Sequence, residues 1–369
     1  EFDGISLQAG YYSGFLSGIA QLSMSDLLGN HSASMFTDYV GSQEISNDFT
    51  FALSYAYFGR RATYSATIFN WNQYYNDTQG RGPVGGYYPV GTTSLTQGLI
   101  RSRQSGLLAD VTYPLDVFRR VELSYSFVDE VREVAWPVTE PVEAFGTHLV
   151  KTAYVHDSLN NGLLGPTAGR RYYISIGRAF ELVDGDRSFT HLEADYRHYF
   201  RLGRWSVLGI RGVGVGSLGR DGLAYNLGGP AWFLPFSPGY NLNLGPLRGY
   251  SFSEFSGSRV VLLNSEVRVP FIRNITFGWP GNFAIPAVDG AFFVDVGGAW
   301  NKGQDLNLWP LQDPLIPYSP ATDEARLQGG MGFSFLVYFL APLNFEFARR
   351  TDFREYSDWR MHFSFGKAF

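Results

Sequence analysis

Three charged residues in the second half of the sequence have the types and spacing to form an ion-pair site: Arg248, Glu266 and Asp295. Glu266 lies in the alternating stretch 258–270, and Asp295 lies in the next one, 292–298. Because side chains two residues apart project to the same side of a strand, both acids fall on the polar faces of neighbouring strands. A buried guanidinium needs a carboxylate partner and offers it a fork of donors, so the chemistry would be ionic binding with a structural role. Periodicity alone also allows ordinary hydrated charges.

Other patterns that could carry chemistry are incomplete. Residues 214–219 (Gly-Val-Gly-Ser-Leu-Gly) formally match a dinucleotide fingerprint, but a Pro- and Gly-rich loop follows where the fingerprint requires a helix. The pairs His148 and His156, and His191 and His198, lack a third convergent metal ligand. The sequence has no Gly-x-Ser-x-Gly elbow and no cysteine. We therefore expect no catalytic residue, no metal site, no cofactor and no enzyme activity.

Composition limits the class of protein. A chain of 369 residues would form two or three soluble domains, or one large barrel. No run of about 18 apolar residues occurs, so no transmembrane helix is expected. Aromatic residues make up 17% of the chain, which suits the girdles that a barrel places at the two membrane interfaces. The net charge of −5 disfavours a nucleic-acid partner.

Sixteen stretches alternate apolar and polar residues with the period of a strand. The fourth is the clearest, because Phe51, Leu53 and Tyr55 face one way and Ala52 and Ser54 the other. The expected strands are about 4–11, 15–23, 31–40, 49–57, 62–71, a sixth ending near 113, 121–127, 147–156, 170–178, 191–197, an eleventh beginning at 205, 258–270, 292–298, 326–338, 343–350 and 359–369.

Two features favour a membrane barrel over a soluble sandwich. The polar faces repeatedly carry charge, which a water-filled lumen tolerates and a dry core does not. Short turns follow the second, fourth, tenth and fourteenth strands, and long loops follow the fifth, seventh, eleventh and thirteenth, as in outer-membrane barrels. The sequence therefore predicts one domain, residues 1–369, that is an all-β, sixteen-stranded antiparallel transmembrane β-barrel with both termini at the periplasmic rim. Lipid contact is expected for Phe51, Leu53, Tyr55, Val261, Leu263, Phe333, Phe335, Phe363 and Phe365, and inward orientation for Asn264, Glu266, Arg268, Asp295 and Glu346.

Several motifs resemble a known family. Leu247-Arg248-Gly249-Tyr250 resembles the Val-Arg-Gly-Phe/Tyr signature in the sixth extracellular loop of the BamA/TamA-like outer-membrane barrel superfamily (the bacterial surface antigen barrel domain). Residues 264–270 resemble the strand after that loop, and residues 292–298 resemble the family's Phe-x-Asp-x-Gly strand. The resemblance implies that the long loop, from about 219 to 258, folds into the lumen. There Arg248, together with Gly249 and Tyr250, would form a clamp with Glu266 and Asp295.

The resemblance also implies a function and a location. The protein would lie in the outer membrane of a Gram-negative-type bacterium and would insert, assemble or translocate polypeptides without catalysis. Its first and last strands would pair poorly and part sideways, offering an edge to a client strand. The residues of this lateral seam are Ile5, Leu7, Ala9, Tyr11, Phe363, Phe365, Gly366 and Phe369.

The implied partners are outer-membrane lipid and lipopolysaccharide, unfolded outer-membrane or secreted polypeptides, and accessory periplasmic or lipoprotein subunits. Three basic clusters could meet lipopolysaccharide phosphates if they lie at the outer rim, although solvated rim charges are the alternative. These clusters are Arg101 with Arg103, Arg119 with Arg120, and Arg349 with Arg350.

Other functions remain open from the sequence. Family members that assemble or secrete proteins carry periplasmic POTRA domains ahead of the barrel, whereas here the first expected strand begins within about five residues of Glu1. A barrel that anchors partner subunits or a missing N-terminal domain is therefore the alternative. A passive porin is disfavoured because the loop signature implies an occluded lumen. Barrel enzymes such as outer-membrane proteases and phospholipases exist, but no Ser/His/Asp set stands out here.

Overall fold

The structure is a computed structural model of the chain. It describes residues 2–12, 15–41, 49–76, 99–136, 140–162, 165–183, 185–229, 244–251, 254–272, 275–278, 283–285, 287–307, 324–338, 342–353 and 355–365. Among these residues, no helix is long and apolar enough to cross a membrane.

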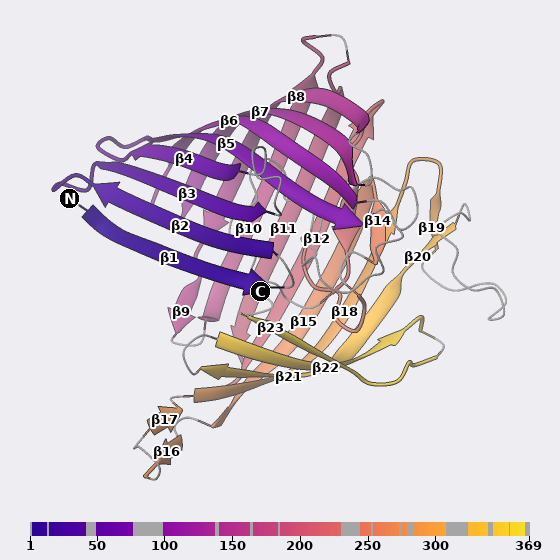
Figure 1. Ribbon diagram of the computed structural model, residues 1–369. Coiled ribbons are helices and arrows are strands. Elements are labelled where there is room, and N and C mark those ends of the chain that lie inside the picture. Colours follow the sequence, from indigo (N-terminus) through magenta and orange to yellow (C-terminus); the bar gives the residue numbers. More distant parts are fainter. Residues whose placement is uncertain are drawn as a thin grey trace.

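Sixteen long strands form one antiparallel sheet in which each strand pairs with the next along the chain, and the sheet curves round on itself as a barrel wall (Figure 1). The first eight are β1 (Phe2–Tyr12), β2 (Phe15–Ser25), β3 (His31–Gly41), β4 (Phe49–Tyr57), β5 (Thr63–Asn76), β6 (Leu99–Pro114), β7 (Arg119–Trp136) and β8 (Glu140–Asp157). The others are β10 (Gly165–Phe180), β11 (Phe189–Arg201), β12 (Val207–Gly219), β15 (Arg259–Ile272), β18 (Ala287–Trp300), β21 (Gln328–Tyr338), β22 (Pro342–Thr351) and β23 (Arg360–Phe365). The all-β, sixteen-stranded antiparallel barrel expected from the sequence is confirmed.

In the described part of the chain, seven short strands lie in the connections between the long strands. They are β9 (Asn160–Gly162), which pairs with the start of β10, and the pairs β13 (Tyr225–Leu227) with β14 (Phe255–Gly257), β16 (Ile275–Phe277) with β17 (Phe283–Ile285), and β19 (Asp305–Asn307) with β20 (Glu324–Arg326). The glycine pattern at 214–219 lies within β12, so it is part of the wall rather than a nucleotide loop.

The two ends of the barrel differ in their connections. At one end the turns are as short as residues 26–30, 58–62, 115–118 and 202–206. At the other end, residues 220–258 connect β12 to β15 and residues 301–327 connect β18 to β21. Because outer-membrane barrels have short periplasmic turns, the short-turn end is the periplasmic one. β1 begins and β23 ends at this end.

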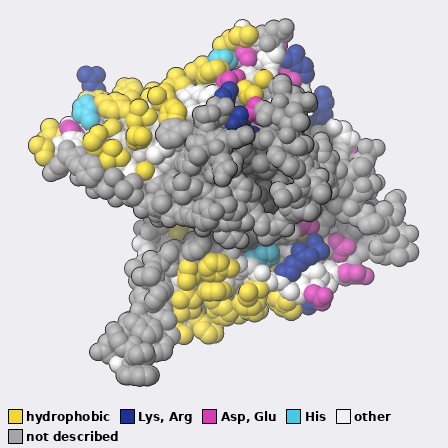
Figure 2. Space-filling view, in the orientation of Figure 1, with side chains coloured by type: hydrophobic (Ala, Val, Ile, Leu, Met, Phe, Trp, Pro, Cys, Tyr) yellow, Lys and Arg dark blue, Asp and Glu magenta, His cyan; other side chains and the backbone are white. Residues whose placement is uncertain are grey.

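The wall separates an apolar outer face from a polar inner face. On β15, Leu263 is 49% exposed, whereas the neighbouring side chains of Asn264 and Glu266 are buried. Figure 2 shows hydrophobic side chains gathered over the outer surface around β21 and β22 and over the strands near β4 to β7. Exposure confirms outward orientation for Leu53, Tyr55, Leu263 and Phe363, and burial confirms inward orientation for Asn264, Glu266, Asp295 and Glu346.

The sequence-based expectation of a long loop after the seventh strand is wrong. β7 and β8 remain paired as far as Val134 and Glu140, so only residues 137–139 separate the two strands. The stretch around Glu130 and Arg132 is rich in charged residues, as exposed loops are. In the structure, however, these two side chains point inward, and Arg132 Nε donates a hydrogen bond of 2.7 Å to Glu130. Glu130 also accepts a hydrogen bond of 3.1 Å from Ser102 on β6. Mutual pairing thus lets charged residues extend a strand.

The orientation of β15 gives the first testable prediction. Replacing Leu263 with Arg should lower the free energy of unfolding in lipid by about 2–4 kcal/mol, because a charge then faces the hydrocarbon. The matched change Ser124→Arg on the inner face of β7, beside a polar cavity, should have a much smaller effect. Urea unfolding in liposomes, followed by tryptophan fluorescence, measures both. Equal losses would contradict the assigned facing.

Candidate functional site

The register of β15 and β18 places the acidic residues of the site together. Asn264 lies directly opposite Asp295 in the paired strands, and Glu266 lies two residues further along the same face of β15. The side chains of Asn264 and Asp295 are completely buried, and that of Glu266 is 4% exposed. The alternation of both strands therefore creates a negatively charged spot on the inner wall.

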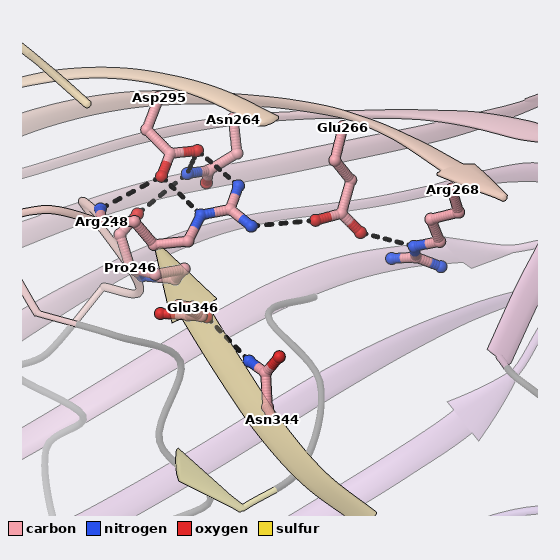
Figure 3. A network of polar contacts seen from close by, with 8 residues as sticks. All are labelled: Pro246, Arg248, Asn264, Glu266, Arg268, Asp295, Asn344 and Glu346. Atoms are coloured by element: carbon pink, nitrogen blue, oxygen red, sulfur yellow. Dashed lines mark hydrogen bonds and ion pairs between the residues drawn. The ribbon is translucent and has the colours of Figure 1, made fainter. Parts of the chain in front are cut away.

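Arg248 reaches this spot from the loop between β12 and β15, which we call loop six (residues 220–258). Its Nε and Nη2 donate hydrogen bonds of 2.7 and 2.6 Å to the two oxygens of Asp295, and its Nη1 donates one of 3.1 Å to Glu266 (Figure 3). Its backbone N–H also donates to Asp295 at 3.1 Å. The structure thus brings together the three charged residues that the sequence singled out, in a two-pronged arrangement that suits a guanidinium.

Burial and charge act in opposite directions on Arg248. The residue is completely buried, and this burial alone would lower its pKa, but the carboxylates of Asp295 and Glu266 raise the pKa above its ordinary value. The guanidinium also lies 3.6 Å from the centre of the Phe293 ring, which covers one of its faces. The arginine therefore stays charged inside the barrel, and its partners are fixed by geometry as well as charge.

Two polar residues that sequence analysis did not assign to the site complete it. Asn264 donates hydrogen bonds of 2.8 Å to the Pro246 carbonyl oxygen and to Asp295, so it holds the loop backbone and one acid together (Figure 3). Glu346 on β22 is completely buried and accepts a 2.8 Å bond from Asn344, and its charge also favours the protonated form of Arg248. The sequence predicted that Asn264 and Glu346 point inward, but it did not predict which groups they contact.

Glycines allow the loop to approach the wall closely. Gly249 has φ = +95°, a conformation that favours glycine, and it packs against the backbone of Arg349 and Arg350. Gly330 on β21 lies against the Arg248 carbonyl oxygen so closely that a methyl group there would overlap it. The segment around Arg248 therefore fits into a notch that β21 leaves open.

Tyr250 attaches the loop to the last strands of the barrel. Its hydroxyl lies 3.1 Å from the Gly329 carbonyl oxygen, 3.2 Å from that of Thr351 and 3.1 Å from Gln328 Oε1. Gly329 belongs to β21 and Thr351 ends β22, so a residue of the predicted clamp also contacts the two strands that precede β23. Tyr250 as a whole is only 3% exposed.

A further basic residue contacts the loop from the other side. Arg211 on β12 is buried and donates hydrogen bonds of 3.1 and 2.8 Å to Asp195 on β11, which also accepts two from Arg197. Arg211 Nη1 lies against Gly245, where φ is +125° and a side chain would collide with the guanidinium. Sequence analysis missed this contact, because the glycine and the arginine are 34 positions apart and no pattern links them.

The rest of loop six fills part of the lumen with apolar side chains. Leu223, Tyr225 and Leu227 from its beginning pack with Leu244 and Leu247 from its end. The same cluster includes wall residues of β8, β10, β11, β12, β15 and β18, namely Leu149, Ala179, Phe189, Val213, Val215, Val260, Leu262 and Ala299. The loop is therefore a plug that packs on one half of the wall, which agrees with the expectation that it folds inward.

Between the plug and the opposite wall lies a polar cavity of about 160 Å³. Asp110, Lys151, His191 and Glu193 line it. His191 Nδ1 lies 2.6 Å from the Tyr225 hydroxyl, so the histidine bonds to the plug, and its Nε2 lies 3.4 Å from Glu193. Among the residues that the structure describes, no group of three or more His, Cys, Asp or Glu side chains is arranged to hold a metal.

The residues of the expected lateral seam fall on the two terminal strands. Ile5, Leu7, Ala9 and Tyr11 lie on β1, and Phe363 and Phe365 lie on β23, with Phe363 46% exposed. Gly366 and Phe369 lie outside the described residues. The poor pairing and sideways opening of this seam stay predictions.

One of the three basic clusters lies away from the outer rim. Arg119 and Arg120 begin β7 directly after the short turn 115–118, so they lie at the periplasmic end. Lipopolysaccharide occupies the opposite leaflet, so this cluster does not meet the condition on which lipopolysaccharide contact was expected. The lengths of the turns, rather than the charges, show at which end of the barrel this cluster lies.

Comparison with known proteins gives one family match. The model described as the Omp85 superfamily domain matches residues 29–369 of the chain. No curated protein matches the sequence significantly.

Two solved structures resemble this chain. The crystal structure of BamA from Haemophilus ducreyi lacking POTRA domains 1–3 aligns with a TM-score of 0.61 and 16% sequence identity, over 97% of this chain and 69% of that chain. CdiB from Acinetobacter baumannii aligns with a TM-score of 0.50 and 14% identity, over 98% of this chain and 58% of that chain. At these identities the likeness concerns the fold.

Proposed function

Because the chain belongs to the Omp85 superfamily, whose barrels reside in the outer membrane, we propose that it inserts polypeptides into that membrane or secretes them across it. We further propose that residues 1–369 act as a single barrel domain and that the activity is not enzymatic. Both solved relatives named above are outer-membrane barrels of this superfamily, and the fold they share with this chain supports the proposal.

The observation that carries the proposal is the buried clamp of Arg248 with Asp295 and Glu266. A passive pore needs an open lumen, whereas here three hydrogen bonds from one arginine side chain hold loop six inside the barrel. Leaving Asp295 without the arginine would strand a buried charge, so the plugged state is favoured. A plugged barrel that still moves polypeptides needs another route.

We propose that the seam between β1 and β23 is this route. An open strand edge presents unpaired N–H and C=O groups, which recruit a further strand. A client strand would pair with the backbone of β1 around Leu7 and Ala9, while β23 around Phe363 moves aside. The clients would be unfolded outer-membrane or secreted polypeptides, with periplasmic subunits delivering them. Anchoring of partner subunits by an otherwise inert barrel is the alternative that the experiment must separate.

The direct test is client folding in reconstituted liposomes. We expect liposomes that contain this protein to accelerate the folding of a denatured outer-membrane barrel at least about tenfold over empty liposomes, which corresponds to about 1.4 kcal/mol of barrier. Heat-modifiable mobility on gels measures the folded fraction over time. Acceleration that is no greater than that given by liposomes carrying a porin would contradict the proposal and favour the anchor.

A further inference from the structure

The outer face of the wall carries a basic and aromatic patch at its periplasmic end. We call it the rim patch and define it by Arg119 on β7, Tyr154 and His156 on β8, Arg170 and Tyr172 on β10, and His198 on β11. The strand registers make it continuous, because Arg119 lies opposite His156, His156 opposite Tyr172, and Arg170 opposite His198. Side chains opposite one another on neighbouring strands are in contact range.

Aromatic contacts fix the shape of the rim patch. The rings of His156 and Tyr172 stack with centres 4.8 Å apart and planes 5° apart, and Tyr154 packs on Tyr172 at 5.9 Å. His198 stacks on Phe200 at 3.9 Å. The patch is therefore an ordered surface rather than a set of loose solvated side chains.

The charge of the rim patch is positive. Arg119 forms an ion pair with Asp116 of the preceding turn, and its hydrogen bond lowers the pKa of that aspartate, which therefore stays charged. Arg170 is exposed, and no carboxylate among the described residues forms an ion pair with it. One positive charge is thus left over on a surface that also presents two histidines.

Polarity changes along the strands in the order of a bilayer. On the outer face of β10, Arg170 is followed by Tyr172 and then by Ile174 and Ile176, which are 55% and 58% exposed. At about 3.3 Å per residue, Arg170 lies about 13 Å from Ile174 along the strand. Outer-face residues of β8 follow a similar order, with His156, Tyr154, the exposed Thr152 and then the exposed Val150. A cationic, an aromatic and an aliphatic level match the headgroup, interfacial and acyl levels of one leaflet.

We propose that the rim patch binds the phosphate of an anionic phospholipid of the inner leaflet, with the acyl chains lying along Ile174 and Ile176. Arginine side chains bind phosphate oxygens through two parallel hydrogen bonds. The leftover positive charge favours an anionic headgroup over a zwitterionic one. The short-turn end places the site in the periplasmic leaflet, away from lipopolysaccharide. A soluble protein partner fits less well, because the patch faces sideways and continues into an aliphatic surface.

Lipid titration followed by native mass spectrometry tests the site in the full chain. We expect phosphatidylglycerol to bind the folded protein more tightly than phosphatidylethanolamine does. The double variant Arg119→Gln, Arg170→Gln should bind phosphatidylglycerol on the order of thirtyfold more weakly, since each arginine near a membrane surface contributes about fivefold. The variant Arg119→Lys, Arg170→Lys should keep most of the affinity, because it keeps the charge.

The matched control removes two exposed arginines from the outer face at the other end of the barrel. Arg103→Gln with Arg178→Gln makes the same change of net charge and should leave the affinity within about twofold. Equal weakening by both double variants would reduce the effect to general attraction and overturn the proposal. Displacement of the lipid by an equal concentration of inorganic phosphate would also overturn it, because the site would then bind free phosphate. Equal affinity for phosphatidylglycerol and phosphatidylethanolamine would also overturn the proposal.

Discussion

Replacing Arg248 with Ala is expected to release loop six from the lumen while the sixteen strands stay paired. The change leaves Asp295 buried without its cationic partner, whereas Glu266 keeps Arg268, and we expect the seated loop to be destabilised by about 3–5 kcal/mol, or less where water enters. Limited proteolysis should cut within residues 220–258 in the variant and not in the parent. The barrel itself should keep its heat-modifiable mobility. Client folding by the liposome assay should fall, because the loop no longer holds β21 and β22 in place.

Arg268→Ala is the matched control for this experiment. Arg268 bonds to the other oxygen of Glu266, but it comes from β15 and does not belong to loop six. Removing it takes one of the two arginines from Glu266, yet Glu266 keeps Arg248 and the clamp on Asp295 stays intact. Loop six should therefore remain protected in this variant. Equal cleavage in the two variants, or full protection in Arg248→Ala, would show that the clamp does not hold the plug.

Locking the seam is expected to abolish client insertion or secretion. Two double variants test this: one replaces Leu7 and Phe363 with cysteine, and the other replaces Ala9 and Phe363. At least one of them should form a disulfide between β1 and β23 when oxidised, and the absence of native cysteine prevents other pairings. We expect activity to fall at least about tenfold, equivalent to about 1.4 kcal/mol of barrier, because a client strand can no longer separate β1 from β23. A reducing agent should restore it. Gel mobility before and after reduction measures the fraction of crosslinked protein.

The control for seam locking is a crosslink elsewhere in the wall. Ser34 and Ser54 lie opposite each other on β3 and β4, and cysteine is close to serine in shape. A disulfide there should leave activity unchanged, because this pair of strands does not open. Normal activity of the barrel locked between β1 and β23 would contradict sideways opening and favour the anchoring function.

Much of the wall was predictable because a strand in a barrel has a strict period of two. Once Leu263 faces lipid, Asn264 and Glu266 must face the lumen, and the neighbouring motif places Asp295 beside them. The family expected from these motifs is confirmed by the match over residues 29–369. The periodicity failed at Glu130 and Arg132, where two charges neutralise each other inside a strand and so look like a loop in the sequence.

The contacts of the plug were less predictable than the wall. Hydrogen bonds such as that from Asn264 to the Pro246 carbonyl oxygen depend on how an irregular loop folds, and such a loop has no period to read. Arg211 meets Gly245 only because β12 and the end of the loop lie side by side in space. Resemblance supplied Arg248 and Tyr250, but the three acceptors around the tyrosine hydroxyl come from distant backbone positions that no motif marks.

The contacts of Tyr250 have a consequence for the order in which the chain folds. Its acceptors lie 78 to 101 residues downstream, in β21 and at the end of β22. Contacts between distant residues form late, because the intervening chain must first be confined. While only the strands up to β18 have formed, loop six therefore lacks the contacts of Tyr250 with β21 and β22. Seating of the plug becomes one of the last steps of folding, and a barrel that lacks its final strands would stay unplugged.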